Sequence, residues 1–288
     1  MATTVTGPRR RRRGVRPGSV VRYAVLAALA LIFLVPFYLL VRNALSTEQE
    51  ITRIDGWTWF PSSPQWGNLS EVFDSTSVPL ARSMVNSLLI AVTQTVGVLI
   101  VSGMAGYGLA RSTVRYANAV FYIVLATLLI PAAVTFVPTF VMVSSLGWVS
   151  TLRGLIVPGL FQALATFLFR QYFLGFPKEL EEAAQIDGAG PWKTFWRIVV
   201  PNSWGFAAAV ATITFIGSWN AFLWPLVIGQ DQSSWTVQIA LSTYVTAQSV
   251  NLHGMFMAAI VSMVPLLLMF LFLQRWIVAG VEQTGINE

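Results

Sequence analysis

Four acidic residues lie close together in one short polar segment, 179–191, which reads ELEEAAQIDGAGP. They are Glu179, Glu181, Glu182 and Asp187, out of twelve acidic residues in a chain that is 55% hydrophobic. A carboxylate near a helix start gains only about 0.3–1 kcal/mol from the helix dipole, which is too little to account for such a cluster. Ion pairs with cations of another protein would make better use of these charges, so we expect an interface here.

Other kinds of chemistry find little support in the residues. The chain has no Cys, and therefore no thiolate nucleophile, disulfide or cysteine metal site. His253 is the single histidine, which favours a loop or helix end over a metal site. The nearest approach to a phosphate-binding loop, GAGPWKT (188–194), has Trp192 where the second glycine is required. We therefore expect no metal, no bound cofactor and no ATP hydrolysis by this chain.

The region around the acidic cluster, 175–203, predicts two short helices joined at a glycine. Pro177 suits the first position of one helix, and Gly188 can end it in a left-handed conformation. Pro191 can begin the second helix, which we expect to stop at Pro201. Four residues of that helix share an apolar face, namely Trp192, Phe195, Trp196 and Val199. Such a pair suits a membrane surface, where it could also be no more than an interfacial lid.

The rest of the chain has the composition of a membrane protein. Its mean hydropathy is +0.66 and only 10% of its residues are charged, against about 25% in soluble domains. A spanning helix needs about 20 apolar residues, and the long gaps between charges predict six of them. The expected division is a disordered basic tail at 1–19, a first helix at 20–45, an external loop at 46–81, a core of five helices at 82–280 and a tail at 281–288. Within the core we expect a helix at 117–143, a fourth span ending near Leu174 and a fifth at 204–229.

Lys and Arg predict the orientation of these spans. Fourteen of the eighteen fall on one side if the spans alternate, and four fall on the other, namely Arg42, Arg53, Arg82 and Arg153. Both termini are therefore expected in the cytoplasm. The run Arg9–Arg13 favours contact with anionic lipid over nucleic acid. The first apolar run is too long for an ordinary signal peptide and lacks a good cleavage site, so we expect it to stay as an anchor.

Polar residues within the spans are uncharged, which argues against a proton-coupled transporter or a voltage sensor. Amides and aromatic rings can hold a hydroxyl-bearing solute, although packing between helices or anchoring at the interface explains each of them equally well. The candidates for a solute path are Asn86, Gln94, Trp219, Asn220 and Trp224. Small residues four apart, at Ser102, Gly106 and Ala110, permit close helix contact, and prolines such as Pro131 predict bent spans.

The acidic segment resembles the EAA loop of the permease subunits of binding-protein-dependent ABC importers. That loop reads E-A-A-x-x-x-G, nine residues, then I-x-L-P. Six positions are in register, namely Glu182, Ala183, Ala184, Gly188, Ile198 and Pro201, while Val200 replaces the usual Leu. Flanking stretches are similar to the carbohydrate-uptake, maltose-type subfamily and its MalG-like permeases. These are WTWFPSSPQWGNLSEVF (57–73), NSLLIAVTQTVGVLIVSGMAGYGLAR (86–111), WNAFLWPLVI (219–228) and MAAIVSMVPLLLMFLFLQRWIVAGV (257–281).

The resemblance implies an all-α polytopic protein with the type I ABC importer permease bundle, in the bacterial inner membrane. It implies a second permease, two ATPase subunits that use ATP and Mg, and an external solute-binding protein. The residues implied to couple to the ATPase are Glu182, Ala183, Ala184, Asp187, Gly188, Ile198 and Pro201. A permease for polyamines, peptides or phosphodiesters is an alternative within the class. A membrane scaffold or insertase, in which the motif is a coincidence, is an alternative outside it.

Overall fold

The computed structural model describes residues 17–53, 56–246 and 250–284, and side chains within 21–53, 56–246 and 250–275. Most of the predicted tails, 1–19 and 281–288, lie outside these ranges. The described residues form helices joined by loops, with a single bridge between Val245 and Val250 as their one β pairing. The longest helices are α1 (Pro17–Ala44), α4 (Leu80–Arg111), α12 (Trp204–Trp219) and α15 (Leu252–Thr284). The first and last of these extend a few residues into the predicted tails.

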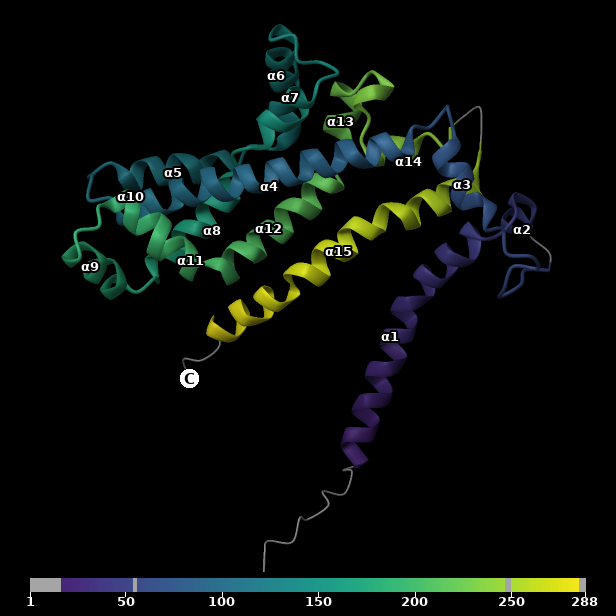
Figure 1. Ribbon diagram of the computed structural model, residues 1–288, viewed down its shortest axis with the longest axis horizontal. Helices are drawn as coiled ribbons and strands as arrows, with labels where there is room; N and C mark the ends of the chain where they lie inside the picture. The colour runs from purple at the N-terminus through teal and green to yellow at the C-terminus, as the bar shows by residue number, and fades with distance from the viewer. Residues whose placement is uncertain (1–16, 54–55, 247–249, 285–288) are drawn as a thin grey trace, which may run out of the picture.

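Helix α4 is the centre of the bundle and packs against α8 (Ala163–Leu174) and α12, and α12 packs in turn on α15 (Figure 1). Small residues make the first contact close, as the sequence predicts. Ser102 is completely buried, and a Cβ added at Gly106 would lie only 2.6 Å from Cβ of Phe169 in α8. Without a hydrophobic force between helices in lipid, this close van der Waals contact is what holds them together.

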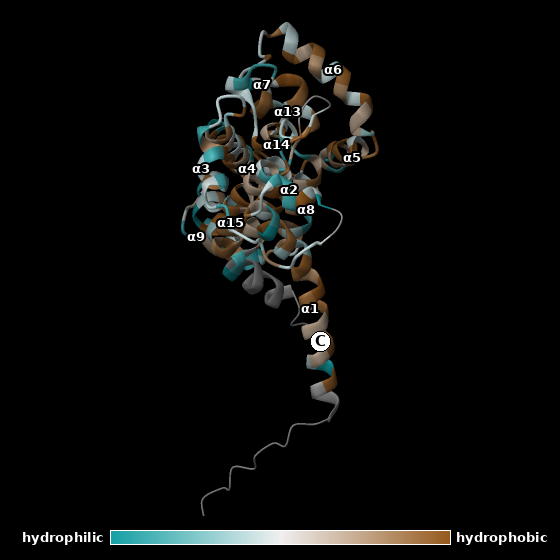
Figure 2. Cartoon of the chain, turned by 90° about the vertical axis from the view of Figure 1, so that its right-hand side faces the viewer, coloured by the Kyte–Doolittle hydropathy of each residue, from teal (hydrophilic) through white to brown (hydrophobic). Residues whose placement is uncertain are grey.

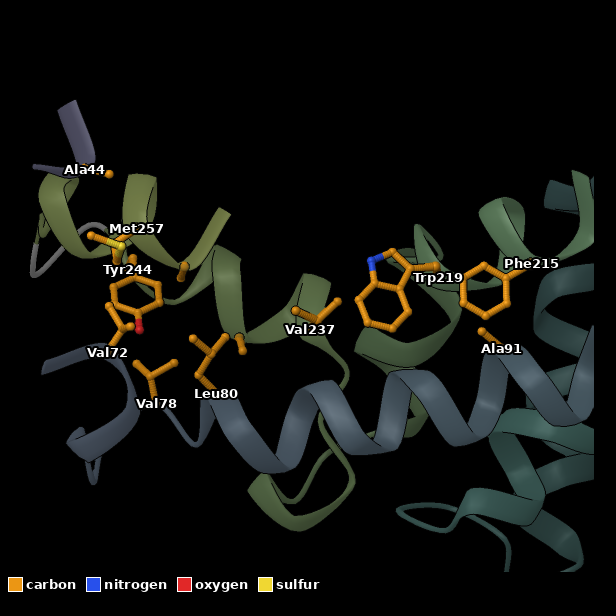
Figure 3. Packing of buried hydrophobic residues seen from close by; sticks show 12 residues of the cluster. Ala44, Val72, Val78, Leu80, Ala91, Phe215, Trp219, Val237, Tyr244 and Met257 are labelled. Carbon is orange, nitrogen blue, oxygen red and sulfur yellow. The ribbon is translucent and has the colours of Figure 1, made fainter. Parts of the chain in front are cut away.

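The largest buried apolar cluster lies at the end of the bundle where α4 begins (Figure 3). It joins Leu80 of α4, Phe215 and Trp219 of α12, Val237 of α14 (Val237–Ser242) and Met257 of α15. At the same end, α2 (Glu48–Thr52) and α3 (Gly67–Asp74) form a polar cover. The core therefore ties the start of α4 to the last helix of the chain.

Helix α1 stands apart from this bundle. It contacts α15 near Ala44 and then runs away from it, with no buried residue in its most apolar 18-residue window (Figure 1). The side of this helix seen in Figure 2 is mostly apolar, and its sequence places no polar stripe on any one face. A helix with this composition is stable in lipid without protein contacts on every side.

Four helices are long and apolar enough to cross a membrane. The number reaches six only if two bent pairs, Ala117–Thr127 with Ala132–Ser145 and Pro191–Asn202 with Trp204–Trp219, each count as one span. The prediction of one helix at 117–143 was wrong. That region is α5 (Ala117–Thr127) followed by α6 (Ala132–Ser145) at 96° to it. Pro131 precedes α6 in a non-helical conformation with ψ of 134°, and its missing N–H and its ring disfavour continuation of α5 through this residue.

The fourth and fifth spans are also interrupted. The fourth runs through α7 (Leu152–Ile156) and η1 (Val157–Gly159) to α8, which ends at Leu174 as predicted. The predicted fifth span, 204–229, contains α12 and α13 (Leu223–Ile228), with a break at 220–222. Helix α12 has only 16 residues, and it reaches the length of a span together with residues 191–202, which lie at 79° to it. At the interruption of the fourth span, Gln94 of α4 donates hydrogen bonds to the carbonyls of Leu155 and Ile156, at 2.9 and 3.3 Å. Backbone groups freed inside a membrane require such partners.

Candidate functional site

The acidic segment folds as the predicted pair of helices at the end of the bundle where α4 terminates (Figure 1). The first helix is α9 (Lys178–Ile186); the second comprises α10 (Pro191–Thr194), the π-helical turn η2 (Phe195–Val199) and α11 (Val200–Asn202). Gly188 has φ of 75°, which confirms the left-handed conformation expected after the first helix. The resemblance implies that residues 178–202 couple this chain to an ATPase, and we therefore call them the coupling segment.

Both proline boundaries need a small correction. Pro177 precedes the first helix as its cap, so the helix begins at Lys178. The second helix does not stop at Pro201 and continues to Asn202. The reason is the π-type hydrogen bond from the N–H of Val200 to the carbonyl of Phe195. This bond shifts the register, and Pro201 then occupies a first-turn position where its missing N–H is tolerated.

Most of the predicted coupling residues lie on the surface. Five of them are exposed, namely Glu182, Ala183, Asp187, Gly188 and Pro201, and Ile198 is half-buried. Ala184 is different, because it is only 6% exposed and faces the chain's own bundle. Its small side chain therefore permits close approach of α9 to this chain, and contact of Ala184 with a partner is not supported in this conformation.

Apolar side chains accompany the exposed carboxylates. Ile186 is 87% exposed at the end of α9, and Trp192 is 64% exposed at the start of the second helix. The expected apolar face of the second helix is buried only at Phe195 and Val199. A protein interface combines exposed apolar side chains with a few charges, and this surface has both. Sequence reasoning missed Ile186, although an isoleucine on a polar helix was a detectable signal.

The sequence pattern did not distinguish Glu181 from the other acidic residues of the cluster. It is 6% exposed, and its carboxylate accepts hydrogen bonds from Arg111 and Tyr107 of α4. Nη2 of Arg111 lies 2.6 Å from Oε1, which makes this a short ion pair. The predicted orientation already placed Arg111 and this segment on the same side of the membrane, but it could not identify which of the neighbouring carboxylates turns inward.

The proposed solute-path residues do not converge on one open surface. Asn86 is buried and donates to the carbonyls of Ser233 and Trp235, at 3.0 and 2.9 Å. Gln94, besides its bonds to α7, accepts a hydrogen bond from Ser218 at 2.6 Å, and Trp224 donates to the carbonyl of Gly154 at 3.1 Å.

Trp219 and Asn220, the remaining candidates, have opposite exposure. Trp219 is only 1% exposed within the apolar core, so it cannot contact a solute in this conformation. Asn220 is exposed, and its Oδ1 accepts from Gln238 at 3.1 Å. Asn220 is the candidate that stays available for a solute.

The end of the bundle away from the coupling segment carries a second polar cluster. Glu48 of α2 accepts hydrogen bonds from the backbone N–H groups of Leu252 and His253 and pairs with Nδ1 of His253 at 2.9 Å. Nε2 of His253 lies 3.3 Å from Glu71 of α3. His253 thus sits at a helix end, as expected, between two carboxylates. Among the side chains that the structure describes, no group of three His, Cys, Asp or Glu residues is arranged to hold a metal ion.

A bundle of apolar helices, several of them broken, with a hinged acidic helix pair at one end, defines a polytopic membrane protein of the permease class. Comparison with known proteins makes this specific. Residues 97–283 match the family described as "Binding-protein-dependent transport system inner membrane component", and the chain belongs to this family. It is thus a permease component of a binding-protein-dependent ABC importer, as the EAA pattern predicted.

Related proteins match over nearly their full length. The sn-glycerol-3-phosphate transport system permease protein UgpE of Pectobacterium atrosepticum is 33% identical, over 89% of this chain and 92% of that protein. The lactose transport system permease protein LacG of Rhizobium radiobacter is 32% identical, over 91% and 94%. A crystal structure of a bacterial ABC transporter involved in the import of the acidic polysaccharide alginate aligns with a TM-score of 0.77. That alignment covers 95% of this chain and 100% of the other at 22% identity, and it confirms the type I permease fold.

Proposed function

We propose that this chain forms one half of the translocation path of an ATP-driven importer for a sugar or sugar-like solute. Its partners would be a second, homologous permease, two ATPase subunits that bind ATP and Mg, and an external solute-binding protein. The names of the relatives support the solute class, since they include permeases for lactose and arabinooligosaccharides. Transport would proceed by alternating access, with the bundle opening in turn to each side.

The observation that carries the proposal is the exposed face of the coupling segment. Glu182 and Asp187 are open to solvent, and Ile186 presents an apolar side chain beside them. The chain has no phosphate-binding loop of its own, so hydrolysis would take place in a separate subunit that binds this face. Cations on that subunit would pair with the carboxylates, and an apolar recess would receive Ile186.

The orientation follows from the same argument. An ATPase is a cytoplasmic protein, so the coupling segment and both termini would lie in the cytoplasm. The opposite end, which carries α2, α3 and the start of α15, would then face the external binding protein. The distribution of Lys and Arg supports this arrangement.

The proposal is tested by expressing the chain with its partner subunits and measuring ATP-driven uptake in proteoliposomes. Ligand binding to the partner binding protein would be screened with mono- and oligosaccharides, and with sn-glycerol-3-phosphate because UgpE relatives are equally similar. We expect uptake of a saccharide that depends on ATP, on the binding protein and on this chain. Binding of a polyamine or a peptide alone would exclude the sugar assignment, and failure of any ATPase to co-purify would exclude the importer.

A further inference from the structure

Helix α9 is attached to the rest of the molecule through few side chains. Of its nine residues, only Glu181 and Ala184 are buried. Residues 175–177 join it to α8, and Gly188 joins it to the second helix of the coupling segment. Because neither connection is a continuous helix, the side-chain contacts of α9 determine how closely it follows movements of the bundle.

The buried carboxylate of Glu181 is bound entirely by α4. Arg111 places Nη2 at 2.6 Å and Nε at 2.8 Å from Oε1, and Tyr107 donates to Oε2 at 3.0 Å. Arg111 also donates to the carbonyl of Phe176, in the loop that leads into α9, at 2.9 Å. The side chains of Arg111 and Glu181 are only 16% and 7% exposed, so water screens this pair little.

Tyr107 also contacts the other helices at this end of the bundle. Its ring centroid lies 4.9 Å from that of Phe195 in the second coupling helix and 5.5 Å from that of Phe173 in α8. Phe195 and Phe173 are themselves buried. Tyr107 and Arg111 are four residues apart and therefore share one face of α4. One turn of α4 thus holds both halves of the coupling segment.

We propose that Tyr107, Arg111 and Glu181 form a rigid joint that transmits displacement of the coupling segment to α4. All three are positioning residues for transport, and the inference rests on the proposed function, in which the exposed face of this segment binds an ATPase. A buried ion pair is a weak source of net stability, because desolvation offsets most of the attraction. It does fix two elements at one distance and angle, since the paired donors and acceptors are directional. Helix α4 contacts both α8 and α12, so its movement reaches the remaining bundle.

The test uses the complete transporter in proteoliposomes and measures solute transported per ATP hydrolysed, together with co-purification of the ATPase. Glu181→Gln and Arg111→Met should retain the ATPase and lower the transport ratio by roughly fivefold or more, the range of ordinary coupling between sites. Tyr107→Phe keeps the ring and loses the hydroxyl, so a smaller decrease is expected. The control is Arg115→Met, an exposed cation in the loop after α4, which should transport normally.

A cross-link separates a mechanical joint from a contribution to stability. The chain has no Cys, so Arg111→Cys with Glu181→Cys introduces two unique thiols when the partner subunits are also cysteine-free. A bis-methanethiosulfonate reagent that spans the missing ion pair should restore the transport ratio, and dithiothreitol should abolish it again. If a single variant fails to insert into the membrane, the comparison of the cross-linked and reduced double-cysteine variant still tests the joint.

Two results would overturn the joint. One is a normal transport ratio in Glu181→Gln, and the other is a cross-linked pair that is inactive or no better than the reduced one. Failure of the proposed function has a different signature, because the ATPase would then be absent from the purified unaltered chain as well as from every variant.

Discussion

At the residue scale, two neighbouring glutamates have opposite surroundings. Glu181 is buried against α4, whereas Glu182 is open to solvent. Successive residues of an α-helix point about 100° apart, so one turn of α9 can bind its own bundle with one carboxylate and a partner with the next. The consequences of substitution at the two positions should therefore differ in kind.

Reversing the charge of Glu182 should weaken association with the ATPase. An interface ion pair that becomes a repulsive pair costs about 2 kcal/mol or more, so Glu182→Lys should reduce the affinity by more than tenfold. The matched control is Asp231→Lys, an exposed charge reversal in the loop after α13, away from the coupling segment. Co-purification and binding measured at two salt concentrations check this. Equal loss in both variants, or loss in neither, would contradict a role for Glu182 at the interface.

Gly188 should tolerate only residues that accept a positive φ. No atom lies within 4 Å of a Cβ built there, so the conformation and not the space limits substitution. Gly188→Val should cost about 1–2 kcal/mol and misplace the two coupling helices, whereas Gly188→Asn should cost less because Asn enters this region more easily. Stimulation of ATP hydrolysis by the loaded binding protein is the measurement. We expect stimulation to be highest in the unaltered chain, lower in Gly188→Asn and lowest in Gly188→Val. Equal stimulation in the two variants would refute the hinge.

At the scale of elements, contacts between long helices are specified by small residues at particular positions. Gly106 and Gly108 are two residues apart in α4, yet only Gly106 faces α8. A Cβ at Gly106 would lie 2.6 Å from Cβ of Phe169 and 2.8 Å from the backbone nitrogen of Arg170, whereas a Cβ at Gly108 meets nothing within 4 Å.

These two glycines give a matched pair of variants. Gly106→Ala should lower the free energy of unfolding by about 1–3 kcal/mol, because α8 must move away from α4 to make room for the added methyl group. Gly108→Ala should be neutral or raise it by up to about 1 kcal/mol through helix propensity. Thermal unfolding of the purified chain in detergent distinguishes them. A lower midpoint for Gly108→Ala than for Gly106→Ala would show that α4 and α8 pack differently.

Helix α15 begins at a cap supplied from another element. Burial raises the pKa of Glu48, but hydrogen bonds from the side chain and backbone of His253 and the backbone of Leu252 outweigh it and hold that pKa below the ordinary 4.5. A carboxyl with a lowered pKa contributes stability that is fully present above its unfolded value and is lost as pH falls through its folded value. Two further charged groups lie at this end of the molecule. Glu71 faces the other ring nitrogen of His253, and Arg42 lies in the last turn of α1, just before α2.

Glu48→Gln should therefore destabilise the chain in a pH-dependent way. We expect a loss of about 1 kcal/mol near pH 7, as for other lost helix caps. The difference from the unaltered chain should shrink as the pH falls below the ordinary 4.5 and through the lower pKa that Glu48 has in the folded chain. Unfolding midpoints of both proteins across this range are the check, and a constant difference down to acidic pH would mean that the charge of Glu48 is not involved.

At the scale of the whole molecule, the two polar ends of the bundle are expected on opposite sides of the membrane. The end with the coupling segment carries the predicted cytoplasmic cations, and the other end carries α2, α3 and the loop before α14. Helix α1 contacts the bundle only near the second of these ends, which leaves most of its surface for lipid or another subunit.

Single-cysteine labelling tests this orientation, because the chain has no Cys of its own. Ser63→Cys and Gln232→Cys should react with a membrane-impermeant maleimide applied from outside whole cells. Ser112→Cys should react only after the membrane is opened, since it follows the end of α4 beside the coupling segment. All three positions are exposed, so lack of access cannot mimic the result. The reverse pattern would invert the topology.

The sequence by itself determined the features that depend on composition and local backbone chemistry. Apolar runs predict spanning helices because charged groups are costly in lipid, and Lys and Arg predict their orientation. The prolines and glycine of this segment predicted two helices hinged at Gly188, and the positive φ there confirms the hinge, because glycine adopts that conformation with little strain. Family and fold class were predictable from the EAA motif and are confirmed by the match over 97–283.

Only the tertiary structure decided which side of each helix faces inward. The polar cluster does not reveal that Glu181 is bound by Arg111 while Glu182 is free, since partners 70 residues apart meet only when α4 and α9 pack together. The burial of Trp219 was likewise set by contacts between distant segments, and Pro131 predicted a bend after α5 but not its angle of 96°. Local sequence specifies helices through hydrogen bonds between near neighbours, whereas the choice of buried face depends on the shape of helices far away in the chain.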